Sequence, residues 1–133
     1  DHLHDKKVLL VDDDMRNMFA LSSALEKAGL IVVLAENGQI VLDVLEQQDD
    51  FDVILMDIMM PVMDGFEAMH RIRQNKRFAE LPIIALTAKA QSKDRDKCIT
   101  AGADDYLSKP VDVDRLLSLI GNWTHDKCTQ DLV

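Results

Sequence analysis

Three aspartates stand side by side at positions 12–14, directly after the apolar run VLLV of residues 8–11. Another aspartate, Asp57, follows the apolar run VILM of residues 53–56. Neighbouring carboxylates repel one another unless a cation lies among them, and ligands that offer only oxygen select a hard ion. A partial set of carboxylates completed by water suits Mg²⁺ better than the larger oxygen cage of Ca²⁺. The pattern therefore predicts a magnesium site.

Two further polar side chains also follow strand-like segments. Thr87 comes directly after the run IIAL of residues 83–86, and Lys109 comes after a short candidate strand at 105–108. In a parallel sheet covered by helices, ligands bind beyond the carboxyl ends of the strands, where neighbouring ends meet. We therefore expect one cleft that gathers carboxylates, a hydroxyl and an ammonium group.

Each of these residues has a plainer interpretation when it is taken alone. Asp14 fits the N-cap of a helix that begins at the next residue. Asp12, Asp13 and Asp57 fit solvated turn residues, and a single threonine or lysine carries little information. Their joint placement at several strand ends is what favours the functional interpretation.

The predicted cleft supports the acceptance of a phosphoryl group. Asp57 can act as a nucleophile toward phosphorus and form an aspartyl phosphate. A divalent cation offsets the repulsion between this carboxylate and the incoming group and holds the phosphoryl oxygens. Lys109 adds a positive charge, and Thr87 can donate a hydrogen bond to a phosphoryl oxygen. No histidine base is needed, because an ionised carboxylate has no proton to lose.

Strands and helices must alternate to position these residues. The apolar runs at 8–11, 30–34, 53–56 and 83–86 contain no regular polar alternation, which indicates strands buried on both faces of a parallel sheet. Helical spacing of apolar residues is found between and after them. The expected helical stripes are Met15, Met18, Phe19, Ser22 and Leu25; Ile40, Val41, Val44 and Leu45; Phe66, Met69 and Ile72; and Val113, Leu116, Leu117 and Ile120, reaching as far as Trp123.

The segment 90–101 is the weakest of the expected helices, because only Cys98, Ile99 and small alanines can face a core. Asp64 and Glu67 resemble a capping box at the start of the third helix. The strand–helix unit repeats five times, which predicts a three-layer, doubly wound α/β domain with right-handed crossovers.

Length and composition limit the possible classes of protein. The chain has 133 residues, 47% of them apolar and 29% charged, which suits one globular domain. A net charge of −9 argues against nucleic acid as a partner. No apolar run approaches the roughly 20 residues of a membrane span, so we expect no direct membrane contact.

Four segments together resemble the signature segments of response-regulator receiver domains of two-component signalling: VLLVDDD, MDIMMPVMDGFE, PIIALTA and GADDYLSKPVD. The resemblance covers the chain up to about Trp123. It implies the flavodoxin-like (CheY-like) fold, a five-stranded parallel sheet in the order 2-1-3-4-5. It also implies that Asp57 is the phosphoacceptor and that Thr87 and Lys109 contact the phosphoryl group.

The same resemblance assigns a metal and a switch. The implied ligands of Mg²⁺, for which Mn²⁺ can substitute, are Asp13, Asp57 and the backbone carbonyl of Met59, with Asp12 acting through water. Tyr106 matches the switch aromatic of the family. Thr87 would turn inward to meet the phosphate, Tyr106 would fill the vacated space, and the weakly anchored segment between them would shift.

We expect a receiver domain at 7–123, an N-terminal extension at 1–6 and a C-terminal tail at 124–133. The stretches VDDDMRNMFAL and LTAKAQSKDRDKCITAGADDYLSKPVD look most like receivers of hybrid sensor histidine kinases, and the first residue is not methionine. The expected partners are therefore a kinase phosphohistidine domain and a histidine phosphotransfer domain. The expected location is the cytoplasm, whether or not a parent histidine kinase is anchored in a membrane, and the isolated domain is not expected to be an enzyme.

Several alternatives remain beside this interpretation. A stand-alone single-domain response regulator would carry the same residues. A phosphatase of the haloacid dehalogenase type would need a second aspartate two residues after the nucleophile, where this chain has Met59. An interaction module with a dead site conflicts with the complete acidic set. A flavodoxin-like flavin protein would need a phosphate loop after the first strand, where DDDMRN would repel the phosphate.

Overall fold

The computed structural model describes residues 5–48, 50–58, 65–87, 92–108 and 111–132. Its strands form one parallel sheet in the order β2-β1-β3-β4-β5, so the predicted fold class and strand order are confirmed. The elements follow one another as β1 (Lys7–Val11), α1 (Met15–Lys27), β2 (Ile31–Ala35), α2 (Gly38–Gln47), β3 (Val53–Asp57), α3 (Gly65–Gln74), η1 (Lys76–Phe78), β4 (Ile83–Thr87), α4 (Ser92–Ala101), β5 (Asp105–Ser108) and α5 (Val113–Leu132).

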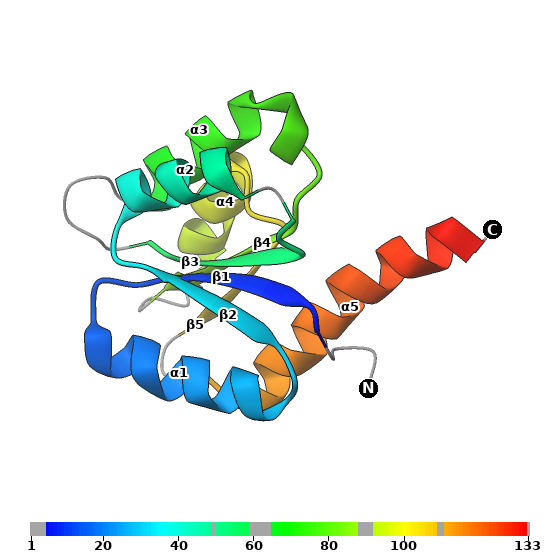
Figure 1. The fold of residues 1–133 in the computed structure, drawn as a ribbon. Helices are drawn as coiled ribbons and strands as arrows, with labels where there is room; N and C mark the ends of the chain where they lie inside the picture. The colour runs from blue at the N-terminus through cyan, green and yellow to red at the C-terminus, as the bar shows by residue number, and fades with distance from the viewer. Residues whose placement is uncertain (1–4, 49, 59–64, 88–91, 109–110, 133) are drawn as a thin grey trace.

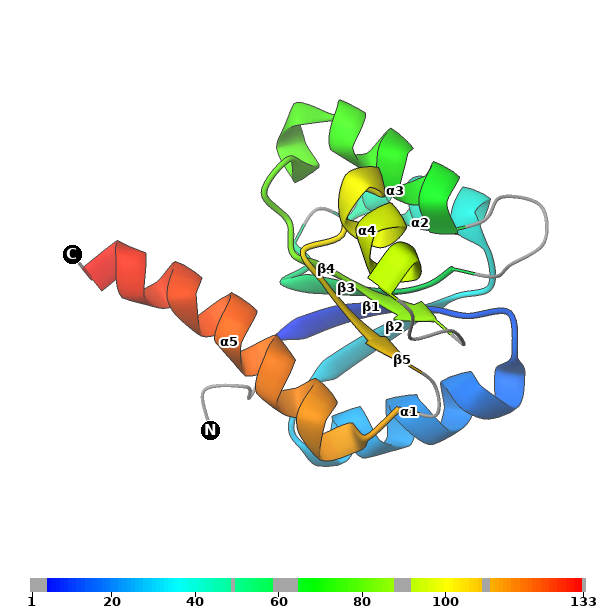
Figure 2. The same ribbon diagram turned by 180° about the vertical axis from the view of Figure 1, so that it is seen from behind.

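Helices cover both faces of the sheet and create two separate cores (Figures 1 and 2). Helices α1 and α5 pack on one face, where Leu25 and Leu116 lie in the same buried cluster. Helices α2, α3 and α4 pack on the other face, where Val41, Met69 and Cys98 share a second cluster. The sheet therefore lies between two helical layers, as the alternation of strands and helices predicted.

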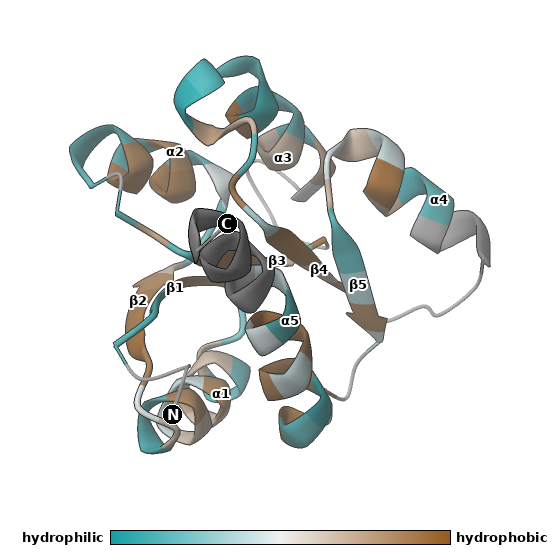
Figure 3. Cartoon of the chain, turned by 90° about the vertical axis from the view of Figure 1, so that its right-hand side faces the viewer, coloured by the Kyte–Doolittle hydropathy of each residue, from teal (hydrophilic) through white to brown (hydrophobic). Residues whose placement is uncertain are grey.

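The apolar runs are buried on both faces of the sheet because successive side chains of a strand point to opposite faces. In β1, Val8 and Leu10 belong to the core under α1 and α5, whereas Leu9 and Val11 belong to the other core. The edge strand β2 is less protected, and only its last residue, Ala35, is buried. Figure 3 shows β2 and β4 as hydrophobic and the edge strand β5 as largely hydrophilic.

The buried stripe of helix α1 overlaps only in part with the predicted one: Met18, Ser22 and Leu25 are buried as expected. Met15 and Phe19 were expected to face the core, but they are 69% and 72% exposed. The prediction was wrong for these two residues because the helix turns an adjacent arc toward the sheet, at positions i, i+3, i+4 and i+7 counted from Met18. The buried residues of this arc are Met18, Leu21, Ser22 and Leu25.

The anchorage of α4 is even thinner than the sequence indicated. Cys98 is 1% exposed, but its neighbour Ile99, which was expected to be able to face the core, is 43% exposed. Consecutive residues of a helix point about 100° apart, so both side chains cannot enter one narrow contact. Among the side chains described in α4, Cys98 alone is buried.

Helix α5 is longer than predicted. The apolar stripe was expected to end near Trp123, yet the helix continues to Leu132 and extends beyond the sheet (Figure 1). Residues 122–132 contain no glycine or proline that would stop a helix. The indole Nε1 of Trp123 donates a 3.4 Å hydrogen bond to Asp105 Oδ2 at the start of β5.

The predicted limits of the receiver domain, residues 7–123, stay a prediction. None of the described helices has both the length and the apolar character of a membrane span.

Lys7 ties the sheet to a loop at the edge opposite the carboxyl ends of the strands. Its ammonium group donates to Gln48 Oε1 at 2.7 Å and to Asp50 Oδ1 at 2.8 Å. The hydrogen bond from Lys7 holds the pKa of the Asp50 carboxyl below its usual value. The backbone N–H of Lys7 donates to Asp52 Oδ2 at 2.8 Å. Asp50 and Asp52 thus serve the fold far from the predicted cleft.

Arg73 of α3 joins three parts of the chain on the face of the sheet that α2, α3 and α4 cover. Its guanidinium donates to the carbonyl oxygens of Gly102 at 2.9 Å, Phe78 at 2.8 Å and Leu81 at 2.7 Å. It also forms a 2.8 Å ion pair with Asp104, and the Arg73 side chain is only 19% exposed. One side chain therefore fixes the end of α4, the loop after η1 and the start of β5 relative to α3.

We expect Arg73→Ala to lower the free energy of unfolding by about 2 kcal/mol, because several partly buried acceptors lose their donor together. Arg71 is a matched control on the same helix, since its 3.8 Å pair with Glu67 is exposed. Arg71→Ala should cost less than about 0.5 kcal/mol. Urea denaturation of both variants measures the difference, and equal losses would contradict the role given to Arg73.

Candidate functional site

The acidic residues gather where β1 and β3 end. Val11 pairs with Met56 in the parallel register of these strands, so the next residues, Asp12 and Asp57, lie at the same edge of the sheet. The backbone N–H of Asp12 also donates to the carbonyl of Ala35 at 3.2 Å, which holds the segment after β1 against the end of β2. The sheet register, and not a local motif, therefore brings the acids together.

Three carboxylates form a compact cluster at this edge. One ligand oxygen from each of Asp12, Asp13 and Asp57 lies within 4.8 Å of the others. Asp12 is 0% and Asp57 is 2% exposed, whereas Asp13 faces solvent. Burying two like charges so close together is costly unless an opposite charge compensates. A set of oxygen donors with one open side fits a hard divalent ion such as Mg²⁺.

Asp12 is oriented by donors from the start of α1. The backbone N–H of Asp14 donates to Asp12 Oδ1 at 2.9 Å, and the Asn17 amide donates to Asp12 Oδ2 at 2.5 Å. Asp14 is the N-cap of α1, because its side chain accepts from the N–H groups of Arg16 and Asn17. The plainer interpretation of Asp14 is thus confirmed. Asn17 was missed, although an amide in the first turn after an acidic triplet was visible in the sequence.

Thr87 reaches the same edge from the neighbouring strand. Asp57 pairs with Leu86, so Thr87 lies one residue beyond that pair at the carboxyl end of β4, and it is 6% exposed. Tyr106 pairs with Ala85 and packs against the core under α2, α3 and α4. Ala85 and Thr87 are two residues apart and therefore share a face of the sheet. Tyr106 and Thr87 consequently lie on the same side of it.

Two of the predicted site residues lie outside the described residues. These are Lys109 and Met59, and the first residue of the expected capping box, Asp64, lies outside them as well. The part of the site that the structure describes therefore consists of Asp12, Asp13, Asp57 and Thr87.

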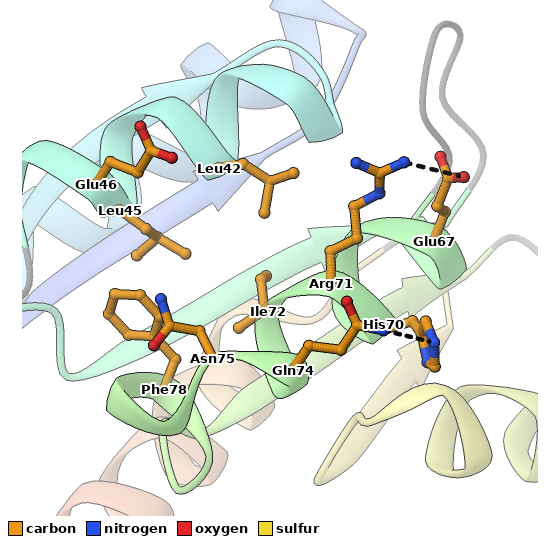
Figure 4. A pocket seen from close by; sticks show the side chains of 10 residues that line it. All are labelled: Leu42, Leu45, Glu46, Glu67, His70, Arg71, Ile72, Gln74, Asn75 and Phe78. Atoms are coloured by element: carbon orange, nitrogen blue, oxygen red, sulfur yellow. Dashed lines mark hydrogen bonds and ion pairs between the residues drawn. The ribbon is translucent and has the colours of Figure 1, made fainter.

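A groove on another part of the domain lies away from the acidic cluster. A groove of about 490 Å³ between α2, α3 and η1 has Leu42, Leu45, Ile72 and Phe78 in its lining (Figure 4). Its rim carries the exposed pair of Glu67 and Arg71 (Figure 4). None of its lining residues belongs to the acidic cluster, so the groove and the site are distinct.

The chain has a doubly wound α/β fold of the class that binds ligands beyond the carboxyl ends of its strands, which is where its buried carboxylates lie. The family model for the response regulator receiver domain matches residues 8–121. The chain belongs to this family and is a receiver domain of two-component phosphorelay signalling.

Similar curated proteins include both long and short chains. The probable transcriptional regulator ycf29 of Pyropia yezoensis is 41% identical over 87% of this chain and 52% of its own length. The sensor protein GacS of Pseudomonas syringae is 38% identical over 89% of this chain and 13% of GacS. The protein PilH of Pseudomonas aeruginosa is 40% identical over 86% of this chain and 93% of PilH. The chain thus spans about half or less of the first two relatives.

Solved structures agree with this assignment. The receiver domain of the sensor histidine kinase PA1611 from Pseudomonas aeruginosa has magnesium coordinated in its active site cleft; it matches with a TM-score of 0.84 and 36% identity, over 91% of this chain and 98% of that one. The receiver domain of Ssk1 from Saccharomyces cerevisiae was crystallised with the histidine phosphotransfer protein Ypd1. It matches with a TM-score of 0.84 and 32% identity, over 96% of this chain and 92% of that one.

Proposed function

We propose that Asp57 accepts a phosphoryl group from a phosphohistidine. A carboxylate oxygen of Asp57 attacks phosphorus, the phosphorus–nitrogen bond breaks, and the imidazole leaves with the electron pair. The observation that carries this proposal is the buried position of Asp57, 2% exposed, within 4.8 Å of two other carboxylates. A carboxylate oxygen in this position lies beside the two groups that would hold a divalent cation, and a phosphoryl group bound to that cation would be within its reach.

The cluster would hold Mg²⁺ through Asp13 and Asp57, with Asp12 acting through water and the Met59 carbonyl completing the set. The ion supplies positive charge that compensates the carboxylates and the phosphoryl oxygens. Support comes from the donor set itself and from the magnesium in the PA1611 receiver domain. Because this donor set contains only oxygen, we propose that Mn²⁺ can replace Mg²⁺.

Thr87 and Tyr106 would report the phosphate to the rest of the domain. The Thr87 hydroxyl would donate a hydrogen bond to a phosphoryl oxygen, and Lys109 would supply a positive charge. Inward rotation of Thr87 would leave space on the face that Tyr106 shares. Helix α4, which has Cys98 as its one buried side chain among those described, would be the element that moves.

We propose that the chain is the receiver of a hybrid sensor histidine kinase and acts in the cytoplasm. The match to 13% of GacS and the likeness to the PA1611 receiver domain support this origin. The match to 93% of PilH supports the alternative of a stand-alone regulator. The donor would be a kinase phosphohistidine, and a histidine phosphotransfer domain, like Ypd1 for the Ssk1 receiver domain, would be a further partner.

The test is incubation of the purified chain with acetyl phosphate in Mg²⁺, in Mn²⁺ and in excess chelator. We expect one added phosphoryl group per chain by intact-mass analysis with either ion, labile in base, and almost none in chelator. Equal labelling in chelator would contradict the metal-assisted reaction. Continuous release of phosphate from many phosphomonoesters would instead indicate a phosphatase.

A further inference from the structure

The Asp12 carboxylate accepts a hydrogen bond from a neighbouring side chain, the amide of Asn17. Asp12 is completely buried, and its two oxygens receive hydrogen bonds from different donors. Oδ1 is held by the backbone of Asp14, a contact that most residues at position 14 would provide. Oδ2 is held by the Nδ2 group of Asn17, which only a side chain of the right length and chemistry can provide.

The position of Asn17 is itself set by the cap of α1. Asp14 Oδ1 accepts a hydrogen bond from the backbone N–H of Asn17 at 3.4 Å. This bond holds the backbone of the first turn of α1, from which the Asn17 side chain extends. Asn17 is half-buried and lies five residues after Asp12 in the sequence. The cap, the amide and the carboxylate therefore form one connected chain of hydrogen bonds that ends in the acidic cluster.

The chemistry of an amide suits this position. A lysine or arginine would bring a positive charge to the cluster and compete with a cation. An aspartate would add a like charge beside a buried carboxylate and offer no hydrogen to donate. An asparagine donates a hydrogen bond to the Asp12 carboxylate without changing the net charge of the cluster.

We infer that Asn17 is a positioning residue that fixes the Asp12 carboxylate so that the acidic cluster can bind a divalent cation. The inference rests on the proposed function, because it concerns the same metal site. Residues that hydrogen-bond to metal ligands commonly change metal affinity by about 10-fold to 100-fold when they are removed. Asp12 acts through water in the proposed site, so we expect a change near the lower end of that range.

The experiment measures Mg²⁺ affinity of the unphosphorylated chain by titration calorimetry, which does not depend on phosphorylation. Asn17→Ala should bind Mg²⁺ about 10-fold more weakly than the wild type. Asn17→Gln keeps an amide donor and should bind more tightly than Asn17→Ala. Unchanged affinity in Asn17→Ala, or equal weakening in both variants, would overturn the inference.

Asn37 provides a matched control, since it caps α2 by accepting a 3.0 Å hydrogen bond from the N–H of Ile40. Asn37→Ala should lower the thermal unfolding midpoint but leave Mg²⁺ affinity unchanged, and circular dichroism confirms that each variant is folded. An equal loss of affinity in this control would show a general effect of destabilisation and would also overturn the inference. If the wild type itself bound no Mg²⁺, the proposed metal site would fail, which is a separate outcome.

Discussion

Asp57→Asn is expected to abolish labelling by acetyl phosphate while the domain stays folded. An asparagine has nearly the shape of an aspartate, so the buried site should accept it without a cavity. Its amide oxygen is a poor nucleophile, and the cluster loses one of the three carboxylates that lie within 4.8 Å of one another. Because like charges in a buried site repel, we expect the variant to be at least as stable as the wild type in chelator.

The matched control is Asp52→Asn, which makes the same aspartate-to-asparagine change. Asp52 directly precedes β3, at the opposite end of the strand from Asp57. Asp52 accepts a 2.8 Å hydrogen bond from the backbone of Lys7 and is far from the carboxyl edge of the sheet. Its variant should be labelled like the wild type. Undiminished labelling of Asp57→Asn, or a phosphoryl group mapped by peptide mass analysis to another residue, would remove the basis of the proposed function.

Gly65→Ala is expected to disturb both the stability of the domain and the acceptor site. A Cβ at Gly65 would lie 2.5 Å from the backbone oxygen of Asp57 and 2.8 Å from Ile58 Cα. The N–H of Gly65 also donates to the Ile58 carbonyl at 3.0 Å, so the start of α3 rests directly on the strand end that carries the acceptor. Neither backbone can move aside without moving the site.

We expect the Gly65→Ala substitution to lower the free energy of unfolding by about 3 kcal/mol. The rate of labelling should fall by at least about 10-fold, because small displacements of reacting groups have large effects on rate. Urea denaturation and the time course of intact mass measure the two quantities.

Gly102→Ala separates a general loss of stability from an effect on the site. Gly102 has a φ of +126°, and an added Cβ would lie 2.8 Å from Arg73 Cγ. This variant should also be destabilised, but its strain arises at the end of α4 and not beneath Asp57. We therefore expect a labelling rate close to that of the wild type under folding conditions. Equal rates in the two glycine variants would refute the specific role of Gly65.

Most of the sheet could be predicted from the sequence because its three central strands, β1, β3 and β4, are buried on both faces. Runs such as VLLV and VILM contain few polar residues for that reason, and each observed strand differs by at most one residue at either end from its predicted run. The convergence of Asp12, Asp57 and Thr87 followed from one rule, since carboxyl ends of parallel strands share an edge. Their roles in binding metal and phosphate stay predictions.

The helices were harder to predict because their contacts depend on docking. Along α1 two neighbouring arcs both contain apolar residues, and only packing against the sheet decides that Leu21 is buried and Phe19 is exposed. The length of α5 was underestimated because its apolar stripe ends before its helical backbone does. Asn17 was missed because its importance depends on side-chain direction within a single turn, which spacing alone does not give.

The contact between Trp123 and Asp105 gives this domain a built-in optical probe. The chain contains a single tryptophan, and its indole donates to Asp105, the residue directly before Tyr106. Fluorescence excited selectively at tryptophan therefore has one source, beside the strand whose aromatic residue is proposed to rotate. A change in emission on phosphorylation would follow events at β5 in real time without any attached dye.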